Sequence, residues 1–235
     1  MGLQKYKYPP NERLYPCERR FFQSLPSSLS ILELGCGTGR VFINLLSLKP
    51  KLLVGIDINE DAVNELEKKL GDRGLIDENV QVLVGDAAEL TKYFSNNSFD
   101  LVVFAFNGID CLYPISARHS ALKEIEKVLA PNGFFYFSSL NPLGIVLSPR
   151  GLHSLNAWKF RLRYILTAGF LKRYIMHPDG FPLHQSLPSS VIREVVNITS
   201  LKFVSATDRT GYISNVFLLT LFSQYPYYLF KKVNK

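Results

Sequence analysis

Three glycines at alternate positions, Gly35, Gly37 and Gly39, constrain the fold of this chain more than any other feature. The apolar run 31–34 leads into them, and the segment 41–46 that follows carries apolar residues at helical spacing. This order predicts a buried strand, a tight turn and a helix. Glycine permits positive φ angles and leaves no Cβ between the backbone and a ligand, and the first amides of a helix favour a polar or anionic group. The turn therefore predicts a ligand-binding site.

The residue after the third glycine distinguishes two classes of cofactor. A dinucleotide fingerprint, G-x-G-x-x-G/A, ends on a small residue that packs the helix against the strand. Counted from Gly35, that position is Arg40, which is too bulky for close packing. The sequence therefore disfavours a dehydrogenase. The pattern that stands here is Glu33-x-Gly35-x-Gly37-x-Gly39.

Two further carboxylates follow predicted strands. Asp57 ends the apolar run 52–57 and lies 18 residues beyond Gly39. At about this spacing, near 20 residues, an acidic residue can accept hydrogen bonds from both ribose hydroxyls of a nucleotide. Its alternative role, a helix cap, is already filled by Asn59. Asp86 follows the strand 80–84 and can accept from an exocyclic amine, although a turn at a strand end also favours aspartate.

These motifs, taken in order, resemble those of class I S-adenosylmethionine (SAM)-dependent methyltransferases, of the type 11 and type 25 kind. The glycine turn resembles the family's first motif, and the other matching segments are Gly85-Asp86-Ala87, Phe99-Asp100 and Pro131-Asn132-Gly133. The resemblance covers about residues 30–140 by motif and 190–222 by topology only. It implies an α/β fold in which a seven-stranded, mostly parallel Rossmann-like sheet has helices on both faces and ends in an antiparallel hairpin.

The resemblance also implies SAM as the cofactor, with S-adenosylhomocysteine as its product. In this family Glu33 and the amides of the glycine turn would orient the methionine part, Asp57 the ribose, and Asp86 with Ala87 the adenine. At the end of the strand 98–106, Asn107 would form a hydrogen bond with the amino-acid end of SAM, and Phe106 would line the methyl-transfer channel. The predicted cofactor-binding residues are Glu33, Gly35, Cys36, Gly37, Asp57, Ile58, Asp86, Ala87, Phe106 and Asn107. No catalytic residue and no metal site is predicted.

The charge of the chain is unevenly distributed. Residues 1–140 carry 15 Lys and Arg against 17 Asp and Glu, whereas residues 141–235 carry 12 against 3. Such asymmetry suggests an acidic partner for the second half, or else a basic face that is only solvated. The apolar runs are too short to span a membrane, the start of the chain carries no signal segment, and three scattered cysteines form no disulfide or zinc pattern. We therefore expect a protein of the reducing cytoplasm.

One domain is expected over residues 1–235, because a chain of this length buries one sizeable α/β core. In the resembled family, residues 1–29 would cap the cofactor and the insertion 142–190 would form a lid over the acceptor. Three of the four histidines, His153, His177 and His184, fall in that insertion and are candidate acceptor contacts. The segments 201–206 and 215–222 are predicted to form the terminal hairpin.

The function predicted first is methyl transfer to an oxygen or nitrogen atom of a small molecule or biosynthetic intermediate, and the basic second half admits an acidic one. Methylation of RNA or protein is the alternative, and it agrees with the basic second half. A SAM-binding partner or sensor without transferase activity has the same cofactor motifs. The loop that begins at Asn107 lacks the N-P-P-Y/F tetrad of many exocyclic amino-group methyltransferases. This disfavours methylation of adenine or glutamine nitrogen. The oligomeric state is left open.

Overall fold

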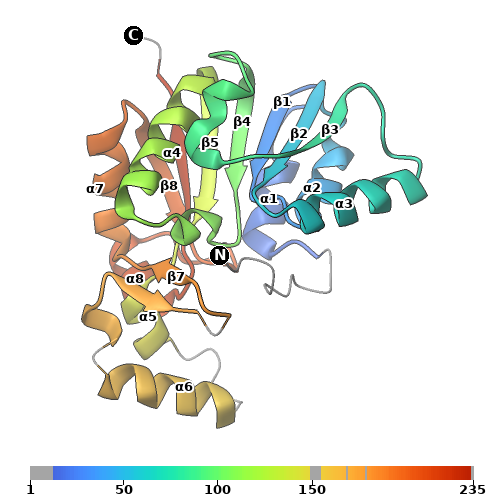
Figure 1. The fold of residues 1–235 in the computed structure, drawn as a ribbon. Coiled ribbons are helices and arrows are strands. Elements are labelled where there is room, and N and C mark those ends of the chain that lie inside the picture. Colours follow the sequence, from blue (N-terminus) through green and yellow to red (C-terminus); the bar gives the residue numbers. More distant parts are fainter. Residues whose placement is uncertain (1–12, 149–154, 168, 178, 234–235) are drawn as a thin grey trace.

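The computed structural model describes residues 13–148, 155–167, 169–177 and 179–233. The first twelve residues of the predicted cap segment, and His153, lie outside the described residues. Within them the chain forms a seven-stranded sheet in the order β3-β2-β1-β4-β5-β9-β8, with β9 antiparallel to its neighbours (Figure 1). Its strands are β1 (Ser30–Leu34), β2 (Leu52–Asp57), β3 (Val80–Val84), β4 (Phe99–Phe104), β5 (Leu129–Ser138), β8 (Lys202–Thr207) and β9 (Tyr227–Lys231).

Helices cover both faces of this sheet (Figure 1). One face packs on α4, α7 and α8, and the opposite face packs on α1, α2 and α3. The helices are α1 (Pro16–Gln23), α2 (Phe42–Leu45), α3 (Glu60–Asp72), α4 (Ile115–Val128), α5 (Pro142–Leu147), α6 (Leu155–Leu166), α7 (Pro188–Ile198) and α8 (Val216–Phe222). Short 3₁₀ turns are η2 (Leu46–Leu48), η3 (Ala87–Lys92), η4 (Gly108–Cys111) and η5 (Gly169–Leu171).

The two faces bury separate apolar cores because successive strand residues point to opposite sides. In β1, for example, Leu32 and Leu34 belong to the core under α4 and α7, and Ile31 belongs to the core under α1, α2 and α3. All three side chains are fully buried. A strand that is buried on both faces appears in the sequence as a nearly continuous apolar run, and for this reason the central strands could be predicted. The predicted fold class and its antiparallel end are confirmed.

The predicted position of the last strand was wrong. Residues 216–222 are the helix α8, and the antiparallel strand between β5 and β8 is β9, which comes later in the chain. Asn215 explains the difference, because its side-chain oxygen accepts from the amides of Phe217 and Leu218 and so caps a helix. A run of seven mostly apolar residues does not by itself distinguish a strand from a helix.

The insertion 142–190 contains α5, α6, η5 and a separate two-stranded sheet of β6 (Tyr174–Met176) and β7 (Pro182–His184). It begins just after the carboxyl end of β5, which is the end of the sheet where parallel strands present their loops to ligands. Among the described residues, no helix is long and apolar enough to cross a membrane.

Candidate functional site

The glycine turn connects β1 to α2 with an unusual backbone. Gly35, Gly37 and Gly39 all have positive φ angles, of 61°, 52° and 93°. At Gly39 two effects exclude a side chain. The positive φ angle disfavours any residue with a Cβ, and a Cβ there would lie 2.4 Å from the Cδ1 atom of Leu66 on α3. The turn thus lets the backbone bend sharply at the carboxyl end of β1 and brings its amides toward the end of β2.

Asp57 braces this turn from the end of β2. Its Oδ2 atom accepts a hydrogen bond of 2.7 Å from the amide of Gly37, and its Oδ1 atom accepts one of 2.9 Å from the amide of Asn59. Burial raises the pKa of Asp57 above its ordinary value, and the hydrogen bonds from the amides oppose that rise. Asn59 itself caps α3, as predicted, so the carboxylate of Asp57 is not needed as a cap.

Glu33 lies on β1 beside these groups and is 3% exposed. Among the described residues, its Oε2 atom has no hydrogen-bond partner. Burial raises the pKa of Glu33 well above its ordinary range, and the nearby charge of Arg40 counteracts this in part. A buried carboxylate oxygen without a donor is costly, and a cationic ligand group would supply the missing hydrogen bond.

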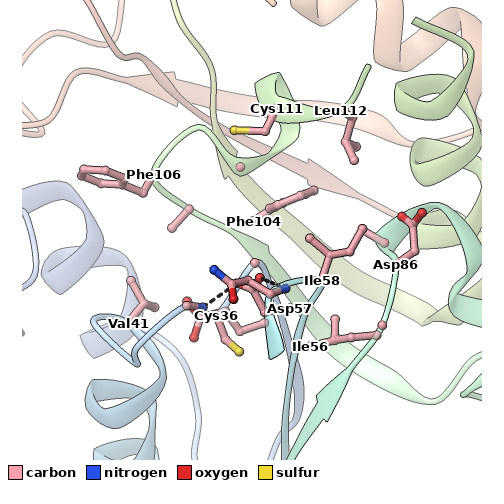
Figure 2. A pocket seen from close by; sticks show the side chains of 18 of the residues that line it. Cys36, Val41, Ile56, Asp57, Ile58, Asp86, Phe104, Phe106, Cys111 and Leu112 are labelled. Carbon is pink, nitrogen blue, oxygen red and sulfur yellow. Dashed lines mark hydrogen bonds between the residues drawn. The ribbon is translucent and has the colours of Figure 1, made fainter. Parts of the chain in front are cut away.

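These residues line a pocket of about 320 Å³ at the carboxyl ends of β1, β2 and β4 (Figure 2). Figure 2 shows Asp57 and Cys36 on one side of it, with Phe106, Cys111 and Leu112 opposite. The pocket brings together nine of the ten residues predicted from the sequence, namely Glu33, Gly35, Cys36, Gly37, Asp57, Ile58, Asp86, Ala87 and Phe106. Asp86 reaches it from the end of β3, where its Oδ1 atom accepts from the amide of Ala88 at 2.8 Å.

Asn107 is the tenth predicted residue and does not belong to the pocket lining. Its backbone has a φ of 60°, and its amide donates to the hydroxyl of Ser138 at the end of β5, at 2.9 Å. Its side-chain oxygen is buried and has no hydrogen-bond partner among the described residues. The predicted bond from Asn107 to a ligand therefore stays a prediction.

Arg40 was read from the sequence only as an obstacle to close packing, yet it lines the pocket and links the glycine turn to α1. Its guanidinium donates to both carboxylate oxygens of Glu18, at 2.7 and 2.6 Å. Glu18 is completely buried and also accepts from the hydroxyl of Tyr227 at 2.8 Å. Arg40 and Glu18 are 22 residues apart, with β1 between them in the chain. No local sequence pattern could therefore predict this ion pair.

A second arginine lies beside the same end of the pocket. The guanidinium of Arg209, on the loop after β8, lies 4.3 Å from the ring centre of Tyr15 and 4.0 Å from that of Tyr225. It also lies 5.8 Å from the ring of Phe106, which lines the pocket. Among the described residues no carboxylate pairs with Arg209, and its Nε atom is buried without a partner. The guanidinium of Arg209 therefore carries a positive charge that no carboxylate of the described residues pairs with.

A buried ion pair fixes the loop that follows β4. Asp110 accepts from Arg118 on α4 at 2.9 Å, from the hydroxyl of Ser139 at 2.8 Å and from the amide of Leu140 at 2.6 Å. This holds the loop, and with it Cys111, against the end of β5. Asp110 is occupied by these bonds and is not part of the pocket lining, so it positions the wall and has no free oxygen toward a ligand.

The histidines of the insertion do not line the pocket where they are described. His184 is 3% exposed, and burial together with Arg118 and Arg173 lowers its pKa to about 3, so its ring is neutral. His177 stacks on Phe181 and lies 3.3 Å from the carboxylate of Asp179. Phe181 itself does line the pocket, so the β6–β7 turn contributes an aromatic ring to it instead of a histidine.

Residues 31–133 match a family model described as a methyltransferase domain. Over these residues the chain is therefore similar to methyltransferase domains, as the sequence motifs predicted. An uncharacterised methyltransferase of Schizosaccharomyces pombe is 32% identical over 110 residues, which are 47% of this chain and 38% of that protein. A tRNA (guanine-N(7)-)-methyltransferase of Lactobacillus acidophilus is 29% identical over 141 residues, covering 56% of this chain and 60% of that protein. The chain thus spans less than two thirds of the length of these relatives.

Solved methyltransferase structures share the fold over nearly the whole chain. The CcbJ methyltransferase from Streptomyces caelestis superposes with a TM-score of 0.68 at 19% identity, covering 97% of this chain and 94% of that one. A SAM-dependent methyltransferase from Methanosarcina mazei gives 0.65 at 20% identity, covering 94% and 99%. The comparisons confirm the predicted family and fold, and SAM as the cofactor of this class.

The methyltransferase pocket fits SAM by the chemistry of its side chains. The orphaned Oε2 atom of Glu33 suits the ammonium of the methionine part, because a cation at this buried site would stabilise the charged carboxylate that burial disfavours. Each carboxylate oxygen of Asp57 has one amide donor and retains a lone pair for a further donor. Among the described residues, no three His, Cys, Asp or Glu side chains are grouped as a metal site requires.

Proposed function

We propose that this chain transfers the methyl group of SAM to an oxygen or nitrogen atom of a small-molecule acceptor. The observation that supports this most directly is a single pocket that joins a polar end, at Glu33, Asp57 and Asp86, to an apolar and aromatic end at Phe106 and Phe181. The polar end has the donors and acceptors for a nucleoside with an amino-acid tail. The aromatic end has the walls for a flat or apolar acceptor.

In this proposal the roles of the polar residues follow from their bonding capacity. Asp57 binds the two ribose hydroxyls, Asp86 accepts from the exocyclic amine of adenine, and Glu33 binds the ammonium group. When bound, SAM supplies a methyl group on a positively charged sulfur, which is an intrinsically good electrophile. The protein then has to hold the acceptor atom in line and exclude water, and the pocket walls at Phe106 and Tyr113 suit that task.

The acceptor in this proposal carries an acidic group, such as a carboxylate or a phosphate. Arg209 supports this, because its guanidinium is partly buried, lacks a carboxylate partner among the described residues and touches Phe106 at the pocket wall. An unpaired, weakly hydrated guanidinium between two tyrosine rings gains most from a bidentate anion.

We further propose that residues 1–235 act as one domain, with 1–29 covering the cofactor and 142–190 covering the acceptor.

Methylation of RNA is the second candidate. A relative named tRNA (guanine-N(7)-)-methyltransferase matches 56% of this chain. The excess of basic residues after position 141 also suits a phosphate backbone. The uncompensated charge at Arg209 agrees with either acceptor. A non-catalytic SAM-binding protein would share the cofactor pocket, and only turnover separates it from an enzyme.

Release of S-adenosylhomocysteine distinguishes these functions. The purified chain is incubated with SAM and either a mixed set of acidic and neutral hydroxyl- or amine-bearing metabolites or unmodified total tRNA. We expect release that depends on the small molecules and is greater with the acidic members of the set. Release with tRNA alone would favour the RNA function. Tight binding of SAM without release under any condition would contradict the proposed enzyme and favour a sensor.

A further inference from the structure

The helix α6 presents an apolar stripe to solvent. At 100° per residue, positions 155, 158, 162, 165 and 166 fall on one face of a helix. All five carry large apolar side chains, and they are unusually exposed: Leu155 81%, Trp158 53%, Leu162 55%, Ile165 42% and Leu166 76%. A helix at the surface of a soluble domain normally turns such a stripe toward the core. Here the stripe points away from it.

The opposite face of α6 explains this orientation. Tyr164 is 5% exposed and packs in a small apolar cluster with Leu140 and Ile145. Its hydroxyl donates to the side-chain oxygen of Gln185 at 2.5 Å, and Arg161 donates to the carbonyl of Ser148 at 2.8 Å. These contacts fix the rotation of the helix, so the exposed stripe is a property of the folded domain and not of a detached segment.

Cations border the stripe on both edges. On the helical wheel Lys159 and Arg163 lie along one edge and Arg161 along the other, and Lys172 and Arg173 follow shortly after the helix. No Asp or Glu occurs anywhere from residue 127 to residue 178. A stripe of leucine, isoleucine and tryptophan flanked by arginine and lysine is the pattern of a helix that lies in the plane of a membrane surface.

Within the described part of the chain, the position of α6 in the fold leaves this face open to such a contact. Figure 1 shows α6 at the lower end of the molecule, beyond α5 and away from the sheet. This is also the end at which α5 leaves β5 and the β6–β7 turn brings Phe181 to the pocket. A surface docked on α6 would therefore lie at the same end of the domain as the pocket.

We propose that α6 binds an anionic membrane surface, with its apolar stripe in the boundary between headgroups and acyl chains. Burial of the five apolar side chains supplies the apolar part of the binding, and the flanking cations are attracted to anionic headgroups. A second copy of this chain fits the face less well, because two α6 helices would bring like charges together. This inference concerns binding and holds whether or not the chain methylates a small molecule.

The test uses Trp158, which is the only tryptophan of the chain and lies in the stripe. The full chain is mixed with vesicles of phosphatidylcholine alone or with an equal amount of phosphatidylglycerol. We expect co-sedimentation and a blue shift of tryptophan emission with the anionic vesicles, both reduced at high salt because exposed charges are screened. Unchanged emission and no co-sedimentation would overturn the proposal, and so would a dimer in light scattering that buries Trp158 without vesicles.

Two variants assign the binding to this face. Leu162→Asp with Leu166→Asp places charge in the stripe at exposed positions, so the fold is expected to persist while binding to anionic vesicles falls about tenfold or more. The matched control is Ile76→Asp, because Ile76 is 54% exposed and precedes β3 at the other edge of the sheet. That variant should bind as the unmodified chain does. Equal binding by all three proteins would contradict the assignment to α6.

Discussion

Replacing Glu18 with alanine is expected to lower the free energy of unfolding by about 3–5 kcal/mol, because it leaves the buried guanidinium of Arg40 without its carboxylate. Glu18 is fully buried, and the pair is bidentate at 2.6 and 2.7 Å. The substitution also removes the acceptor for the amide of Tyr15 and for the hydroxyl of Tyr227, both at 2.8 Å. Urea unfolding followed by circular dichroism measures the loss.

The control for this change is Glu65→Ala. Glu65 pairs with Lys69 at 2.7 Å, but its side chain is 55% exposed and solvent screens the pair. Exposed pairs of this kind contribute about 0–1 kcal/mol. If Glu18→Ala were as mild as Glu65→Ala, the ion pair would not hold α1 against the glycine turn. A second variant, Glu18→Gln, keeps an acceptor for the amide of Tyr15 and should therefore lose less stability than Glu18→Ala.

Replacing Asp57 with alanine is expected to weaken the binding of S-adenosylhomocysteine by about 1.5–3 kcal/mol, which is about 10- to 150-fold in dissociation constant. The reason is the loss of hydrogen bonds from the ribose hydroxyls to a charged and largely buried acceptor. The substitution also frees the amide of Gly37, so the turn loses one of its braces. Isothermal titration calorimetry measures the affinity, and thermal unfolding without ligand shows how much stability is lost.

Asp61→Ala is the matched control, because Asp61 is an exposed carboxylate four residues away, in the first turn of α3 and outside the pocket lining. Its removal should leave the affinity for S-adenosylhomocysteine unchanged. If Asp57→Ala binds the ligand as tightly as Asp61→Ala does, the assignment of Asp57 to the ribose is wrong, and the carboxylate only braces the glycine turn.

The parts of this fold that could be predicted are those with a local cause. The glycine turn, Asp57 and Asp86 each stand at the end of a buried strand, and parallel strands bring their carboxyl ends to one edge of the sheet. Nine of the ten predicted residues meet in one pocket for this reason. Asn107 does not line it, because its backbone turns to bond Ser138 on the neighbouring strand.

The features that escaped prediction depend on contacts between distant segments. The partner of Arg40 is on α1, and the aromatic rings around Arg209 come from the N-terminal segment and from the residues before β9. The exposed stripe of α6 was not predicted, because only packing around Tyr164 decides which face of that helix is buried. The last strand was predicted at the wrong place in the chain, because an apolar run of this length can form either a strand or a helix.

Binding of SAM in the pocket is tested most directly by a thermal-shift titration with SAM, S-adenosylhomocysteine and NAD. At about 100 times its dissociation constant a ligand adds about 2.7 kcal/mol of stability. For a chain of this size we expect a rise in Tm of about 5–10 °C with both adenosyl ligands and none with NAD. A rise with NAD alone would contradict the assignment of the glycine turn, and of the residues that face it, to SAM.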